Sequence, residues 1–126
     1  MAIATIDAAD IVKSASIPGV DQVFTMGIPK EYISDLSSTL VLITDANANP
    51  DLYGSGKFHA LSRMVEVQVF YKDEPTVDPE ATLVALYKVF ESAGWTLGQS
   101  HGFQRDPDTD GLYVTFYVTD EKVINN

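Results

Sequence analysis

Four residues near the C-terminal end have the types and spacing that open a calcium-binding loop. Asp106, Asp108 and Asp110 alternate along the chain, and Gly111 follows directly. In such loops, side-chain oxygens at alternate positions surround a hard cation and a glycine permits the bend. The pattern then fails, because Tyr117 stands where a bidentate glutamate is needed. We therefore expect a turn between two strands, with a weak cation site at the three aspartates as the open alternative.

The other residues capable of acid–base or nucleophilic chemistry are scattered. His59 and His101 are the only histidines and the chain has no cysteine, so no zinc-binding set is visible and both are expected to be solvated or hydrogen-bonded. No Gly-x-Ser-x-Gly motif places a serine on a strained turn. Glu66 and Glu80 have no carboxylate partner arranged for general acid–base work. We predict that the protein is not an enzyme and uses no metal or cofactor.

A glycine-rich segment, Gly54-Ser55-Gly56-Lys57, superficially resembles a phosphate-binding loop. That loop needs a glycine where this chain has Asp51, and a serine or threonine where it has Phe58. The segment ends a stretch from Asp45 to Gly56 that is rich in asparagine, proline and glycine. Such a composition is typical of a loop, and we predict that this is the longest loop of the protein.

Size and charge restrict the function further. With 126 residues the chain is long enough for one domain, spanning residues 1–126, and the net charge of −10 opposes binding to phosphate backbones. No apolar run approaches the ~20 residues that cross a bilayer. The N-terminus lacks the basic region and apolar centre of a signal peptide. Nucleic-acid recognition, membrane insertion and signal-peptide export are therefore not expected.

Two helices are predicted. The first spans Thr5 to Ser14, with Thr5 as N-cap. Its modest apolar face comprises Ile3 and Ile6, with Ala9 and either Ile11 or Val12 as further candidates. The second opens at Asp78-Pro79-Glu80, where Asp78 is a cap and Pro79 suits the first position. Its apolar stripe recurs at helical spacing, at Leu83, Leu86, Tyr87 and Phe90.

Five strands are predicted between and after these helices: Val20 to Met26, Thr39 to Thr44, Leu61 to Lys72, Trp95 to Arg105 and Leu112 to Thr119. Residues 30–38 are left open between a turn and a brief helix. Strands that run in pairs, without regular βαβ alternation, favour antiparallel pairing. The prediction is an α+β fold, with a mostly antiparallel sheet, two helices packed on one face, and the order α-β-β-β-α-β-β.

Several segments resemble one family of short phage proteins. They are Ile17 to Phe24, Ile28 to Glu31, Val65 to Lys72, Glu91 to Trp95, Asp106 to Thr109 and Leu112 to Tyr117. The resemblance, in order and spacing over nearly the whole chain, is to tail components of long-tailed phages and prophages of Gram-positive bacteria. These proteins look like tail terminator (tail completion) proteins.

This resemblance implies a tail-terminator-like fold, no catalytic residues, and a place in the virion after synthesis in the host cytoplasm. It also implies a ring homo-oligomer, commonly a hexamer, that contacts the tail tube protein and the head-tail connector proteins. A connector, or another minor tail protein, is the nearest alternative. A monomeric peptide- or ligand-binding module is the alternative from a different class.

A ring closes when one surface patch meets a different patch on the next copy. Loops and sheet edges supply such patches. The candidate subunit interface therefore lies in and beside the predicted loop, at Asn47, Asn49, Tyr53, Lys57 and Phe58. An acidic surplus would also suit a DNA passage lined with carboxylates, which repels the phosphate backbone.

Overall fold

A computed structural model describes residues 2–33 and 36–124. Along the chain, its elements are α1 (Ala4–Ala15), β1 (Gln22–Thr25), the 3-10 helix η1 (Lys30–Tyr32), β2 (Leu40–Gly54), β3 (Lys57–Phe70), α2 (Pro79–Ser92), β4 (Thr96–Arg105) and β5 (Leu112–Val123). Apart from η1, which lies in the segment left open, this is the predicted order of helices and strands. No helix among the described residues is both long and apolar enough to cross a membrane.

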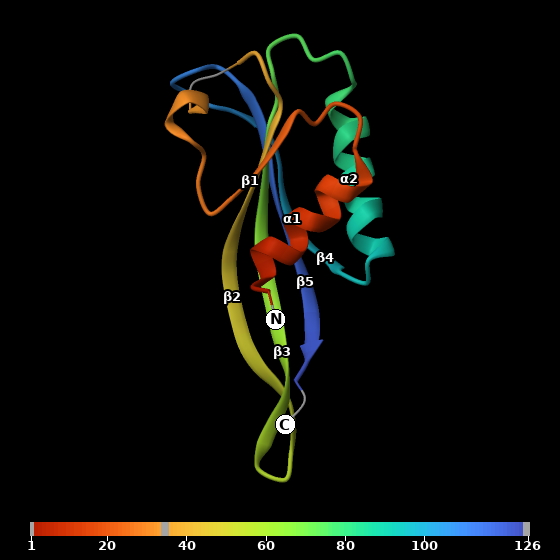
Figure 1. Ribbon diagram of the computed structural model, residues 1–126. Coiled ribbons are helices and arrows are strands. Elements are labelled where there is room, and N and C mark those ends of the chain that lie inside the picture. The colour runs from red at the N-terminus through yellow and green to blue at the C-terminus, as the bar shows by residue number, and fades with distance from the viewer. Residues whose placement is uncertain (1, 34–35, 125–126) are drawn as a thin grey trace.

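The strands form one five-stranded sheet in the order β1-β2-β3-β5-β4. β1 pairs with β2 in parallel, and the other three pairings are antiparallel. Both helices lie on the same side of this sheet, with α1 near β1 to β3 and α2 beside β4 (Figure 1). The predicted α+β architecture, a mostly antiparallel sheet with two helices on one face, is therefore confirmed.

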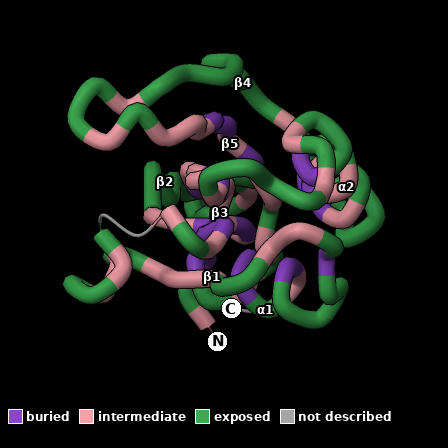
Figure 2. Tube along the Cα trace, turned by 90° about the horizontal axis from the view of Figure 1, so that it is seen from above, coloured by how far each residue is buried: buried purple, intermediate pink, exposed green. Residues whose placement is uncertain are grey.

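Alternating apolar residues of the central strands form the core. Val65, Val67 and Val69 of β3 are fully buried, because successive side chains of a strand point to opposite faces and these three face the helices. On β5, Phe116 is buried and packs edge-on against Tyr87 of α2, with ring centroids 4.8 Å apart. Figure 2 shows buried segments concentrated between the sheet and the helices.

Helix α1 begins one residue earlier than predicted and buries only part of the predicted face, because Ala9 and Val12 are buried as expected whereas Ile3 and Ile6 are not. Its buried residues are Ala4, Thr5, Ala8, Ala9 and Val12. Ile3 and Ile6, predicted to face the core, are 55% and 45% exposed. The small side chains let the helix lie close to the sheet, so they occupy the contact in place of the larger isoleucines. Thr5 is not the N-cap but lies within the helix, fully buried.

Helix α2 begins at Pro79 as predicted, but the Asp78 side chain makes no capping hydrogen bond. Leu83, Leu86 and Phe90 are buried as the helical spacing predicted, and Tyr87 is partly buried against the core. Burial of one such side chain contributes about 1.5–3 kcal/mol. The helix is thus held mainly by its apolar stripe, since the expected side-chain cap is missing.

The predicted loop from Asp45 to Gly56 is wrong. β2 continues to Gly54 and β3 starts at Lys57, so the two strands form one long hairpin joined by Ser55 and Gly56. Both turn residues have positive φ, 53° and 73°, which is the geometry that matches the right-handed twist of the flanking strands. Backbone pairing with β3 therefore outweighs the low strand propensity of the asparagines and Pro50.

Candidate assembly surfaces

The far half of the β2–β3 hairpin protrudes beyond both helices (Figure 1). We define the arm as residues 45–63, and its tip as Leu52, Tyr53, Lys57 and Phe58. At the tip, Leu52 is 51% exposed, Tyr53 70% and Phe58 38%. An exposed apolar group at the end of a strand ribbon is typical of a contact with another molecule.

The register of the hairpin places most of the predicted interface residues together. Asn47 pairs with Met64, Asn49 with Ser62 and Tyr53 with Phe58. A bulge between Asp45 and Asn47 shifts the alternation, so that Asn47, Asn49, Tyr53 and Phe58 share one face of the arm. Lys57 pairs with Gly54 and belongs to the opposite face. The structure therefore brings together four of the five predicted residues.

The side-chain hydrogen bonds along this face are long and therefore weak. The side-chain amide of Asn49 donates to Asn47 Oδ1 over 3.4 Å, and that of Asn47 lies 3.8 Å from Met64 Sδ. Glu121 of β5 pairs with Ser62 of the arm. Desolvation, and then the hydrogen bond with Asp51, raise the pKa of Glu121. The face offers amides, carboxylates and apolar side chains, which suits binding but supplies no nucleophile held beside a base.

Arg63 fixes the base of the arm to the body of the protein. Its guanidinium donates to both carboxylate oxygens of Asp120, over 2.8 and 2.7 Å, and to Asp7 Oδ2 over 3.0 Å. It also donates to the carbonyl of Ala2 and lies over the ring of Trp95, 5.9 Å from its centroid. The hydrogen bond with Asp120, and then that with Asp7, raise the pKa of Arg63 against the effect of burial. One buried cation thus joins β3, β5 and α1.

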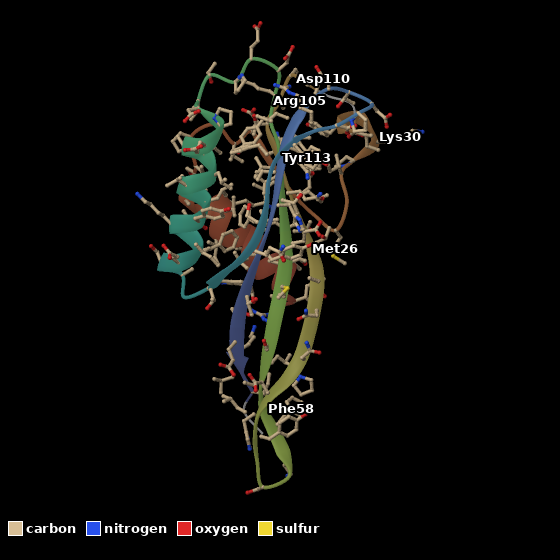
Figure 3. The ribbon with its side chains drawn as sticks, turned by 180° about the vertical axis from the view of Figure 1, so that it is seen from behind. Met26, Lys30, Phe58, Arg105, Asp110 and Tyr113 are labelled. Atoms are coloured by element: carbon tan, nitrogen blue, oxygen red, sulfur yellow. The ribbon has the colours of Figure 1, made fainter. Side chains whose placement is uncertain are left out.

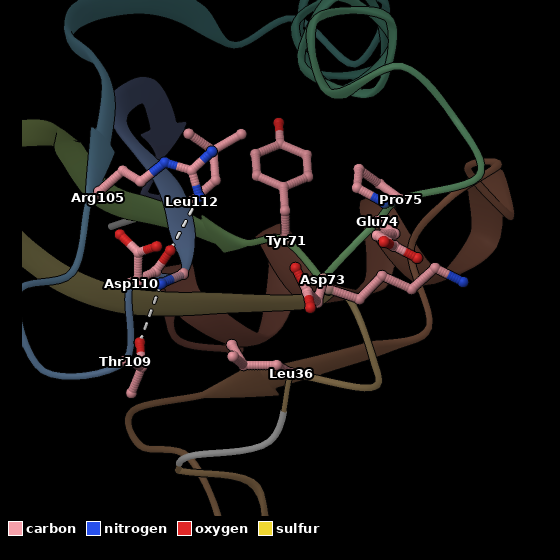
Figure 4. Close-up of a pocket in the computed structure, with 11 residues that line it drawn as sticks. Leu36, Tyr71, Asp73, Glu74, Pro75, Arg105, Thr109, Asp110 and Leu112 are labelled. Carbon is pink, nitrogen blue, oxygen red and sulfur yellow. Dashed lines mark hydrogen bonds between the residues drawn. The ribbon is translucent and has the colours of Figure 1, made fainter.

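The turn between β4 and β5 is a compact hydrogen-bonded structure. Asp106 Oδ1 accepts from the backbone N–H of Asp108 over 2.8 Å, and Arg105 donates to the carbonyl of Asp110 over 2.9 Å. Figure 4 shows the second of these bonds beside a cavity of about 200 Å³. No group of three or more acidic or histidine side chains within the described residues could hold a metal ion. The hydrogen bonds within residues 105–110 confirm the expected turn between two strands.

Both histidines make local contacts. His59 Nε2 lies 3.1 Å from the carbonyl oxygen of Gly54, inside the arm turn. The ring of His101 packs edge-on against Tyr117, with centroids 5.8 Å apart. The hydrogen-bonded role expected for His59 is thereby confirmed, and Gly54 to Lys57 is a hairpin turn rather than a flexible loop.

The sheet face opposite the helices is rich in aromatic and amide groups. We call it the open face and define it by Gln68, Phe70, Tyr113, Thr115 and Tyr117. The Phe70 and Tyr113 rings stack at 5.9 Å, and Gln68 donates to the Thr115 hydroxyl over 3.3 Å. The Tyr117 hydroxyl donates to Glu66 over 2.8 Å, and this bond raises the pKa of Tyr117.

A second hollow lies at the end of the sheet away from the arm tip. This end pocket has a volume of about 220 Å³ and an apolar wall that includes Ile28, Tyr32, Leu40, Phe70 and Leu112. Asp106 and Thr109 add polar groups to its lining. The pocket lies where η1, Ile33 and Leu36 meet the end of the open face, next to the β4–β5 turn.

The sequence matches, over residues 3–124, the family described as "Protein of unknown function (DUF806)". That range contains every helix and strand of the described fold completely. The chain belongs to the DUF806 family. A comparison with curated proteins finds no match. Both the arm and the end pocket of this DUF806 protein lie within the matched residues.

Sequence reasoning missed three features of this DUF806 chain. Arg63 falls in phase with the buried Val65, Val67 and Val69, so an ionic residue on a core-facing position was a visible signal. The two-residue turn was also visible, because Ser-Gly between Tyr53 and Phe58 favours a tight hairpin. The end pocket had no comparable signal, since its walls come from four separate parts of the chain.

Proposed function

We propose that this protein is a structural subunit of a tailed-phage virion, most simply the tail terminator that forms a ring at the head-proximal end of the tail tube. The observation that carries the proposal is the arm, which holds Leu52 and Tyr53 out from the body with half or more of each side chain exposed. Apolar side chains exposed to this degree at the end of a projection suit contact with a neighbouring subunit.

The shape of the sheet supports assembly of this kind. β1 and the outer side of the arm lie at one edge of the sheet, and β4 lies at the other. Because the two edges differ in sequence and length, a contact between them is heterologous and leads to a ring when the rotation closes. The partners of the ring would be further copies, in a hexamer by the family resemblance, together with the tail tube protein and the head-tail connector proteins.

The chemistry of the surface is consistent with a non-enzymatic role. Asp51 at the arm accepts from the backbone N–H of Leu52, Asp106 at the β4–β5 turn accepts from that of Asp108, and His59 Nε2 lies against the carbonyl oxygen of Gly54, so these groups serve local structure. The net charge of −10 would let DNA pass through a ring without adhering.

The end pocket favours a second candidate, a monomeric module that binds a peptide or small ligand. Its apolar wall and two polar groups are the usual features of a ligand site. Light scattering of the purified protein separates the two candidates, since the terminator self-associates and the module does not.

Labelling of virions tests the terminator directly. Antibody-bound gold should appear at the head-proximal end of the tail, once per particle. Decoration along the whole tube would contradict termination, and decoration within the neck would favour the connector. Particles that contain none of the protein would overturn the virion assignment altogether.

A further inference from the structure

The arm tip and the end pocket lie at opposite ends of the same strand. Phe58 stands near the start of β3 and Phe70 is its last residue, a separation on the order of 40 Å at about 3.3 Å per residue. Figure 3 shows Phe58 at one end of the molecule, with Arg105, Asp110 and Lys30 at the other. The tip of a chain therefore cannot reach the pocket of the same chain.

The two features match in size. A cavity of about 150 Å³ lined by apolar side chains holds a benzene molecule, so the end pocket, at about 220 Å³, has room for one phenol ring. Tyr53 is 70% exposed, the highest fraction among the large apolar side chains of the described residues. Its hydroxyl would need a hydrogen-bond partner once buried, and the pocket offers the Asp106 carboxylate and the Thr109 hydroxyl.

The two features also match in charge. Lys57 lies at the tip, directly after the Ser55-Gly56 turn, and takes part in none of the ion pairs within the described residues. At the other end, Asp106 lines the end pocket, and Asp73, Glu74 and Asp110 lie around the adjoining cavity together with the cations Lys72 and Arg105, so that carboxylates outnumber cations there (Figure 4). A lysine entering this acid-rich end gains favourable charge contacts.

We propose that the end pocket of one copy receives the arm tip of a second copy, with the Tyr53 ring in the pocket and Lys57 against its acidic rim. The inference deepens the proposed function and rests on it, because it names the two patches that the subunits use. Since each copy carries one tip and one pocket, the contact is heterologous and each subunit binds two neighbours. A chain of such contacts closes as a ring when the rotation between neighbouring copies returns to the start.

Complementary variants test this contact. Tyr53→Ser disables the tip, and Thr109→Trp fills the pocket from its partly exposed wall. Val84→Ser is the matched control, because Val84 is 41% exposed on α2, away from both features. Circular dichroism first establishes that all three variants are folded. Sedimentation velocity then measures self-association over a wide range of protein concentration.

The expected results are specific to a heterologous contact. Each disabled variant alone should associate at least tenfold more weakly than the wild type, and the control should behave as the wild type. An equimolar mixture of Tyr53→Ser and Thr109→Trp should form a 1:1 heterodimer and nothing larger, since one tip and one pocket remain. Lys57→Glu should weaken association and reverse its response to salt, because the charge at the acidic rim changes sign.

Three results would overturn the inference: a wild type that stays monomeric, single variants that associate as strongly as the wild type, or a mixture that stays monomeric. A wild type that stays monomeric would also count against the terminator in the light-scattering test, whereas the other two results leave the virion assignment untouched, and the gold labelling decides that assignment. Conversely, virions that lack the protein would remove the proposed function, and the mixing experiment would still report whether tip and pocket bind each other.

Discussion

Replacement of Arg63 by methionine should lower the free energy of unfolding by about 3 kcal/mol, since removal of one partner of a buried ion pair costs about 3–5 kcal/mol. The side chain of Arg63 is only 6% exposed, and its fork makes two bonds to Asp120, which is 17% exposed. The lower end of the range applies because Asp7, at 31% exposed, regains water when the arginine is lost.

Urea denaturation followed by circular dichroism measures this loss, with the m-value as a check that the unfolded state is unchanged. Asp120→Asn should cost more than Asp7→Asn, because the bidentate bonds of Asp120 are shorter and less exposed than the single 3.0 Å bond to Asp7. Lys122→Met is the control, since its contact with Asp7 is 3.5 Å long and partly exposed. A loss below about 1 kcal/mol for Arg63→Met, the range of an exposed pair, would refute this account of the cluster.

Three further predictions concern the body of the protein. Burial, then the charges of Tyr87 and Asp78, raise the pKa of Tyr71 above its ordinary value, so its contribution to stability is complete below about pH 10, the unfolded tyrosine pKa, and is lost as the pH rises further. In the wild type, the urea midpoint should therefore be lower at strongly alkaline pH than at neutral pH. In Tyr71→Phe this drop between the two pH values should be smaller, and a drop as large as that of the wild type would contradict the burial argument. Thr5→Val should raise the melting temperature, with a gain of about 1 kcal/mol, because Thr5 Oγ1 is buried without a hydrogen-bond partner among the described residues; a lower melting temperature would mean that the hydroxyl is satisfied. Gly19→Ala should lower the free energy of unfolding by about 2 kcal/mol or more, because Gly19 has a φ of 92° and an added Cβ would lie 2.9 Å from Thr82 Oγ1. Gly27→Ala is the control and should be near neutral in the same urea assay, since an added Cβ there would have nothing within 4 Å.

The sequence alone determined the fold class and the order of the elements. Period-two alternation in β3 and β5, and the stripe of Leu83, Leu86 and Phe90 in α2, depend on local geometry that a single segment displays. The turn at Asp106 to Gly111 was likewise readable, because aspartate, proline and glycine act on their own backbone. These patterns say which face of an element is apolar.

Only the tertiary structure decided the rest. The arm exists because Asn47, Asn49 and Pro50 pair with β3, and that pairing is a property of two segments together. Arg63 is tolerated in the core because Asp7 and Asp120, far away in sequence, meet it there. The face that α1 buries was set by the space left between helix and sheet, which favours Ala8 and Ala9 over the larger Ile6. Local patterns record the preferences of one segment, whereas pairing, charge compensation and fit depend on partners that only folding brings together.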